Sequence, residues 1–299
     1  MQLKNALKAL LISSLASAPA VAQELEPRTY TNLPVGETFI VAGYIYSEGD
    51  LSPVPGSPLQ DAELSLDTGI LGAAHTFEIA GSSAKVDAVI GRSCYEGSAI
   101  FQGVPTEGRR CEYTDSKLRL GWNFYGAPAL KLKEFRQWQP GLVLGASLQI
   151  SAPTGSYDSD QLINAGANRW MVRPGLGMSY RLGKWHFDTS ASVRFYETNT
   201  DFFDGNKREQ DPLYSAQAHI VRGLGKGRWV SVNLNYFWGG KTTLNGDTQD
   251  DRQDNSRFGI TYSQPLTPHH SIKLYANSGV ITRIGNDFDT YGFAWQYRF

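Results

Sequence analysis

The side chains most often used in catalysis or metal binding are five histidines and a cluster of aspartates. The histidines are His75, His186, His219, His269 and His270. None lies in a His-x-Ser pattern on an apolar strand face, as a serine hydrolase at that face would need. The aspartates between residues 247 and 254 lack the spacing of a calcium loop. The sequence therefore predicts no catalytic site, no metal site and no cofactor. A hydrolase is the least favoured class of function.

Two cysteines form the one pair that can make a covalent cross-link. Cys94 and Cys111 have sixteen residues between them, which matches no metal or redox motif. A chain that is exported passes through an oxidising compartment, so we expect a disulfide, with two free thiols as the alternative. Closing a loop of this length stabilises a fold by about 3 kcal/mol in the chain-entropy model.

Charged side chains alternate with apolar ones along many short segments. Leu118 and Leu120, for example, alternate with Lys117 and Arg119. This two-residue period is typical of a strand with one apolar and one polar face. The same alternation places eleven ionisable side chains on polar faces. They are Asp87, Lys117, Arg119, Arg173, Arg181, His186, Asp188, Arg194, His219, Lys273 and Arg298.

The last nine residues indicate what covers the apolar faces. Tyr291, Phe293, Trp295, Tyr297 and Phe299 occupy every second position of a strand with an aromatic face. A soluble sheet would hide this face under a second layer, whereas a transmembrane β-barrel exposes it to lipid. A C-terminal strand that ends in phenylalanine also resembles the signal by which assembly machinery recognises outer-membrane proteins. The alternative is a sandwich strand covered by an earlier segment.

The N-terminus predicts export. Lys4 and Lys8 precede the apolar run of residues 9–15, and Ala20 and Ala22 form a small-x-small cleavage site. We expect a signal peptide over residues 1–22. The formal charge of −1 argues against nucleic acid as a partner. The 31 glycines and the 12% of aromatic residues fit a barrel in which outward apolar residues alternate with polar ones.

The remaining chain predicts one domain. We expect a periplasmic lead-in over residues 23–36, too short for a plug domain. A single antiparallel barrel of about 12 strands (10 to 14) should occupy residues 37–299, in the bacterial outer membrane. Short and long connections alternate, as they do in such barrels. Residues 130–138 have a helical period and predict one short periplasmic helix.

Several motifs resemble the outer-membrane transporter family associated with the meta-pathway of phenol degradation. The matching stretches are Glu26–Arg28, Gly126–Ala129, Ser151–Tyr157, Asn168–Trp170, Arg208–Tyr214 and Asp250–Arg257. They are spread over nearly the whole mature chain. The resemblance implies passive uptake of small compounds, aromatic or otherwise hydrophobic, with membrane lipid as the surroundings. The cysteine loop is not a feature of this resemblance.

The polar faces should line the barrel interior. With Leu64, Leu66 and Ile70 assigned to the outside, Glu63 and Asp67 join the interior, which then carries seven basic and four acidic groups. An open aqueous pore with this balance would favour anions slightly. In the alternative, opposite charges pair and fill the lumen, and the barrel is structural or adhesive.

Overall fold

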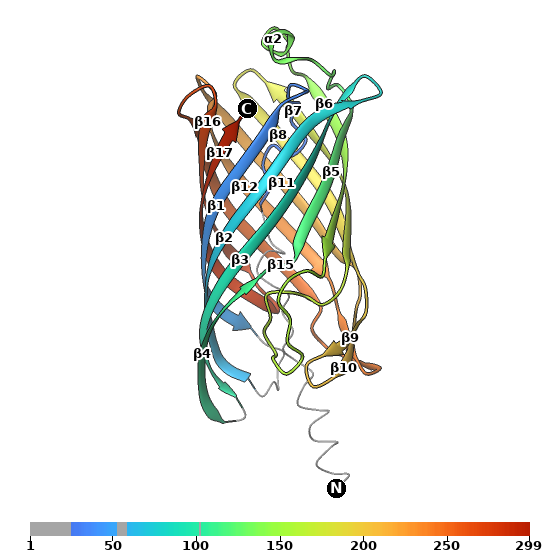
Figure 1. Cartoon of the computed structure of the whole chain (residues 1–299), viewed down its shortest axis with the longest axis vertical. Helices are drawn as coiled ribbons and strands as arrows, with labels where there is room; N and C mark the ends of the chain where they lie inside the picture. The colour runs from blue at the N-terminus through green and yellow to red at the C-terminus, as the bar shows by residue number, and fades with distance from the viewer. Residues whose placement is uncertain (1–24, 53–58, 102) are drawn as a thin grey trace.

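The alternating segments form a closed ring of twelve antiparallel strands (Figure 1). The computed structural model describes residues 25–52, 59–101 and 103–299. The barrel strands are β1 (Thr38–Ser52), β2 (Leu59–Ile79), β3 (Ser82–Phe101), β5 (Ser116–Tyr125), β6 (Leu142–Ala152), β7 (Met171–Leu182), β8 (Trp185–Tyr196), β11 (Leu213–Gly225), β12 (Arg228–Gly239), β15 (Gln253–Pro265), β16 (His270–Ile281) and β17 (Gly285–Arg298). Pairing of β1 with β17 closes the ring. The predicted antiparallel barrel of about twelve strands is confirmed.

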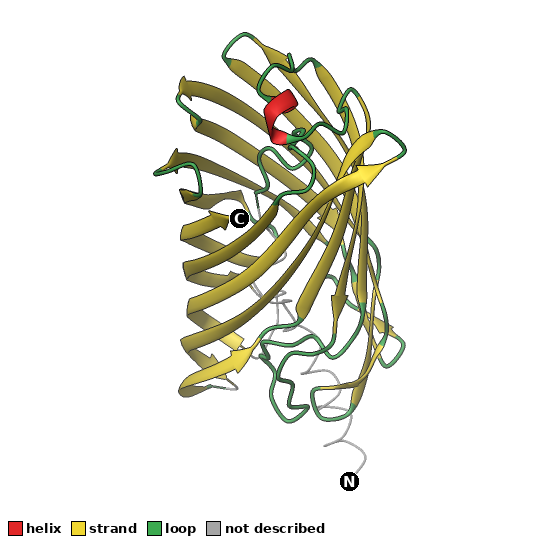
Figure 2. Ribbon diagram, turned by 45° about the horizontal axis from the view of Figure 1, so that its top comes forward, coloured by secondary structure: helices red, strands yellow, loops and turns green. Residues whose placement is uncertain are grey.

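The two ends of the barrel differ in their connections. One end has short turns, such as Ala80–Gly81, where both residues have positive φ as a tight hairpin turn requires. The C-terminus and the helix α2 (Leu132–Phe135) lie at this end, and Figure 2 shows the tilted strands that lead to it. Short turns are periplasmic in bacterial barrels. The short helix predicted near residues 130–138 is therefore present at the periplasmic end.

Longer connections gather at the opposite, extracellular end. They include a small second sheet made of β9 (Asn199–Phe202), β10 (Asn206–Gln210), β13 (Thr242–Leu244) and β14 (Asp247–Thr248). The strand β4 (Val104–Tyr113) also lies there and pairs with β3. Since about 10 residues suffice to cross a bilayer, the 21 residues of β2 and the 20 of β3 extend well beyond it.

The outside of the barrel is apolar. Large side chains such as Leu120, Leu176, Ile220 and Leu234 point outward and are exposed. An apolar surface of this extent is unstable in water, but lipid covers it in a transmembrane barrel. The C-terminal strand joins this surface, since Tyr291, Phe293 and Phe299 are exposed and Trp295 and Tyr297 are half-buried. No helix in the part of the chain that the structure describes is long and apolar enough to cross a membrane.

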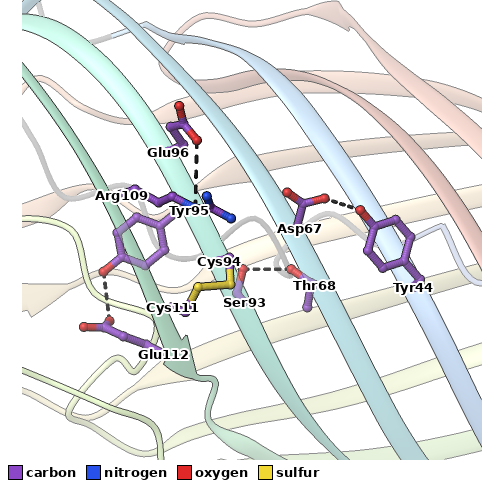
Figure 3. The surroundings of a disulfide bond; sticks show 10 residues. All are labelled: Tyr44, Asp67, Thr68, Ser93, Cys94, Tyr95, Glu96, Arg109, Cys111 and Glu112. Atoms are coloured by element: carbon purple, nitrogen blue, oxygen red, sulfur yellow. Dashed lines mark hydrogen bonds and ion pairs between the residues drawn. A yellow bond between two sulfur atoms is a disulfide. The ribbon is translucent and has the colours of Figure 1, made fainter.

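The inward and outward faces of strand β2 are reversed relative to the prediction. The cavity inside the barrel is lined by Leu64, Leu66 and Ile70 of β2, so the alternate residues Glu63 and Asp67 point outward. Asp67 accepts a hydrogen bond from Tyr44 on the outer surface (Figure 3). The prediction was wrong because it equated apolar with lipid-facing. Near Glu63 and Asp67, β2 extends beyond the bilayer, where a polar outer face is solvated. Closer to the membrane, Leu71 is the exposed apolar residue on the outside, and its neighbour Ile70 points inward.

The predicted disulfide is confirmed. Cys94 of β3 lies directly opposite Cys111 of β4, and their sulfur atoms are bonded (Figure 3). On the inner side of the same hairpin, Tyr95 donates a hydrogen bond to Glu112 at 2.8 Å. The disulfide therefore fastens a hairpin that stands above the membrane.

We predict that Cys94→Ser loosens this hairpin and leaves the barrel folded. Losing the cross-link should remove about 3 kcal/mol of local stability, because non-covalent contacts alone, such as strand pairing and the Tyr95–Glu112 hydrogen bond, then hold β4 to β3. Trypsin cleavage after Arg109 and Arg110 should become faster, measured on reduced gels of quenched samples. The heat-dependent gel shift of the folded barrel should not change, and Cys111→Ser should behave identically. An unchanged cleavage rate would show that the disulfide does not hold the hairpin.

Candidate functional site

The barrel encloses a cavity of about 810 Å³. Strands β1, β2 and β3 contribute six aliphatic side chains to its lining: Val41, Ile45, Leu64, Leu66, Ile70 and Val89. In the middle of the opposite strands β11 and β12 the inward residues are polar, for example Gln217, His219, Asn233 and Asn235, all of them buried, whereas the strand ends bury apolar residues such as Val221 and Phe237. The lumen is therefore amphipathic in cross-section. An aliphatic wall, interrupted by polar residues such as Thr68 and Asp87, faces a mostly polar wall.

We expected residues 23–36 to form a periplasmic lead-in. The structure instead places the segment of residues 25–34 inside the barrel. The backbone N–H of Glu26 donates to Gln217 of β11, and that of Arg28 donates to Asp188 of β8. The segment therefore packs on the polar wall. It supplies backbone and side-chain partners to polar groups that would otherwise need water. The aliphatic wall of β1 to β3 stays open to the cavity.

Glu26 is the centre of an ion-pair network. Its two carboxylate oxygens lie 2.6 Å from Arg119 on β5 and 2.7 Å from Arg173 on β7. Asp87 accepts a bond from Arg119 at 3.3 Å, and Gln149 accepts one from Arg173 at 3.0 Å. The two bonds to Glu26 have the short length that is typical of strong, charge-assisted hydrogen bonds. The network ties the segment to strands on both sides of β6.

Tyr30 fixes the segment through shape. Its hydroxyl lies 2.9 Å from the Ser147 hydroxyl, and the residue is only 7% exposed. The ring fills a socket whose base is formed by two inward-facing glycines, Gly145 of β6 and Gly177 of β7. A Cβ at Gly145 would lie 2.5 Å from the ring, and a Cβ at Gly177 would overlap it. These positions need glycine because the ring occupies the space of a side chain.

The polar residues predicted to line the lumen fall into three groups. Asp87, Lys117, Arg119 and Lys273 line the cavity. Arg173, Asp188, Arg194 and His219 are buried, and Arg173 and Asp188 bind the segment directly. His186, Arg181 and Arg298 complete the set. His186 is half-buried, and Arg181 binds the Gly183 carbonyl in a periplasmic turn. Arg298 pairs with Glu37 at 3.5 Å, at the periplasmic rim.

Other cavity residues were missed. Lys85 and Arg257 sit next to outward apolar residues, so strand alternation could have identified both. Arg208 lies in the small extracellular sheet, where no alternation pattern marks it. Among the described residues, seven basic side chains line the cavity: Arg28, Lys85, Lys117, Arg119, Arg208, Arg257 and Lys273. Four acidic ones join them: Glu26, Asp87, Asp115 and Asp251.

Both ends of the cavity carry basic groups. Towards the periplasm, the Trp229 ring lies 5.6 Å from the Arg28 guanidinium and 5.9 Å from the Lys273 ammonium. At the extracellular end, burial and the neighbouring Arg169 lower the pKa of Arg208 to about 9. Within the described ranges, no group of three or more His, Cys, Asp or Glu side chains is placed to hold a metal ion. The lining of the cavity therefore has a basic character.

We predict that Gly177→Ala destabilises the barrel more strongly while Tyr30 is present. The added methyl group collides with the ring, and overpacking of this kind costs about 1–3 kcal/mol. In a Tyr30→Ala background the same change should cost less, because the contact with the ring is gone and the close contact with the Thr189 carbonyl oxygen, at 2.9 Å, remains. The two substitutions should therefore be coupled in a double-mutant cycle. Denaturant unfolding in detergent measures this coupling.

Gly121→Ala is the matched control for the glycine socket. Gly121 also faces inward, but its added Cβ would lie 3.9 Å from the nearest atom, the Lys85 carbonyl oxygen. This variant should unfold like the wild type. Additive costs for Gly177→Ala and Tyr30→Ala would mean that the ring does not occupy the socket.

Comparisons with known proteins agree with this geometry. The crystal structure of the COG4313 outer membrane channel from Pseudomonas putida F1 matches with a TM-score of 0.77 and 24% identity. The match covers 92% of this chain and 100% of that chain. The β domain of the Bordetella autotransporter BrkA matches with a TM-score of 0.52 and 12% identity, over 89% and 100% of the two chains. These likenesses establish the fold.

The family is established by sequence. No curated protein matches the chain. A family model described as "Putative MetA-pathway of phenol degradation" matches residues 48–297, which include nearly the whole barrel. The chain belongs to this family, as a β-barrel of the bacterial outer membrane.

Proposed function

We propose that the protein is a passive channel for small amphipathic compounds, aromatic ones among them. The observation that supports this most is the amphipathic cavity of about 810 Å³. Its volume lies within the usual range for small-molecule sites. An aromatic solute can lay its ring on Ile45, Ile70 and Val89 while a polar substituent contacts the opposite side. The family description, which mentions phenol degradation, is consistent with this solute class.

The alternative is a structural or adhesive barrel with a filled lumen. The segment of residues 25–34 does fill the polar side of the interior, through Glu26, Arg28 and Tyr30. Leu64 and Leu66 pack with Tyr95, Ala165 and Phe288. The other four aliphatic side chains of β1 to β3 nevertheless border the open cavity: Val41, Ile45, Ile70 and Val89. A purely structural barrel gains nothing from an apolar inner wall without a partner, so the channel is the better proposal.

We predict that deleting residues 25–32 enlarges the pore. The deletion removes the side chains that narrow the polar half of the lumen, so single-channel conductance should rise by about two-fold or more. Planar-bilayer recording of refolded protein in a salt gradient measures it. The reversal potential should indicate a weak anion preference in both forms, because basic groups outnumber acidic ones in the cavity.

Two outcomes would contradict this proposal. Folded protein that never conducts, with or without residues 25–32, would favour the structural barrel. A cation preference would mean that the lining charges do not govern permeation. The heat-dependent gel shift serves as the control, since it establishes that each variant is folded before its conductance is compared.

We also propose that the barrel assembly machinery recognises the C-terminal aromatic strand. Phe299 is 61% exposed, and its backbone N–H donates to the Thr38 carbonyl at 3.0 Å. Its ring lies edge-on to that of Tyr297, with the ring centroids 4.9 Å apart. We predict that Phe299→Ala loses this contact, changes stability by about 1 kcal/mol or less and leaves refolding in detergent intact. The yield in cellular outer membranes should nevertheless fall several-fold. Equal cellular yields would argue against this role.

A further inference from the structure

Arg119 and Arg173 together bind one carboxylate in the lumen, that of Glu26. We propose that these two arginines form a binding site for the carboxylate of small aromatic acids. In this view Glu26 is an internal ligand that holds the site until a solute carboxylate replaces it. The inference rests on the proposed channel function and specifies its solute class as amphiphilic organic anions.

The geometry resembles that of a carboxylate receptor. Each Glu26 oxygen binds a different guanidinium, at 2.6 Å for Arg119 and 2.7 Å for Arg173. In the sheet register, Arg119 lies opposite Gln149, and Gln149 lies opposite Arg173. The two arginines thus project from one rigid row of three neighbouring strands. Rigid elements hold binding groups more precisely than loops do.

Other side chains orient both guanidiniums independently of Glu26. Arg119 donates to Asp87 at 3.3 Å, and Arg173 donates to Gln149 at 3.0 Å. Asp87 and Gln149 belong to the barrel wall, so the arginines keep these partners when the segment moves. The site is therefore preorganised for an anion that arrives from elsewhere, which lowers the cost of binding it.

Removing Glu26 without a replacement is costly. Arg173 is 9% exposed, and a partly buried cation that loses its carboxylate pays a desolvation penalty. A solute carboxylate can offset this penalty, whereas a neutral solute cannot. When the segment leaves the polar half of the lumen, an anionic solute should therefore bind there more favourably than a neutral one. The segment thus helps to select the class of solute.

An apolar surface adjoins the arginine pair. Asp87 lies opposite Arg119 in the β3–β5 register, and Val89 is the next inward residue along β3. Ile70 lies opposite Gly91, one inward position further. A carboxylate bound by the arginines would thus place an attached aromatic ring near Val89 and Ile70. The arrangement matches an aromatic acid better than an inorganic anion.

Calorimetry with benzoate and benzamide on the refolded full-length barrel tests this proposal. The two probes share a ring and differ in charge. Glu26→Gln removes the competing carboxylate with almost no change in shape, so benzoate should bind at least about ten-fold more tightly than to the wild type. Benzamide binding should stay unchanged. Adding Arg173→Gln to Glu26→Gln should abolish the gain for benzoate.

Glu37→Gln is the matched control, because it also removes a carboxylate that pairs with a wall arginine, Arg298, but outside the cavity. It should bind benzoate like the wild type. Equal benzoate affinity in Glu26→Gln and wild type overturns the proposal. An equal gain for benzamide also overturns it, since that gain would reflect space rather than charge.

Refolding provides a second measurement if Glu26→Gln folds poorly. Benzoate in the refolding buffer should then restore the yield, and benzamide should not. A refolding yield that does not change when benzoate is added overturns the proposal. Because binding and refolding in detergent need no transport, they can succeed even if the barrel fails to conduct. Failure of the channel function and failure of the carboxylate site are therefore distinguishable.

Discussion

Backbone hydrogen bonding in a medium without water is the constraint on which this structure depends. Every N–H and C=O at membrane depth needs a partner, so the sheet must close, as β1 does against β17. Closure then divides side chains between lipid and lumen with a strict period of two. Outward leucines and aromatics follow from this division, and so does the concentration of charge inside.

Closure also creates a problem for the interior. A wall of buried polar side chains such as Gln217, His219 and Asn233 needs partners. The segment of residues 25–34 supplies some of them, with its backbone on Gln217 and Asp188 and its carboxylate on Arg119 and Arg173. The aliphatic side chains of β1 to β3 offer such a segment no hydrogen bonds, although Thr76 of β2 donates to the Pro34 carbonyl at 2.7 Å. The distribution of polar and aliphatic side chains thus determines which side of the lumen the segment covers and which side stays open.

The sequence predicted what depends on local pattern. The alternation around Leu118 and Arg119 identified strands, and the aromatic C-terminus identified the membrane. The position of Glu26 could not be predicted, because its partners lie 93 and 147 residues away and no periodic pattern marks an ion pair. The reversed face of β2 was missed for a different reason. Alternation gives two faces but does not say which faces inward, and above the bilayer the apolar face is the inner one.

The same reasoning explains why the N-terminal segment need not be a permanent part of the wall. Tyr30 is held by shape, in a socket that requires Gly145 and Gly177, whereas Glu26 is held by charge. Shape complementarity discriminates strongly against substitutes, but an arginine pair accepts any carboxylate that reaches it. The two anchors therefore differ in kind. Tyr30 positions the segment, and the ion pair at Glu26 is the contact that a solute of matching charge can replace.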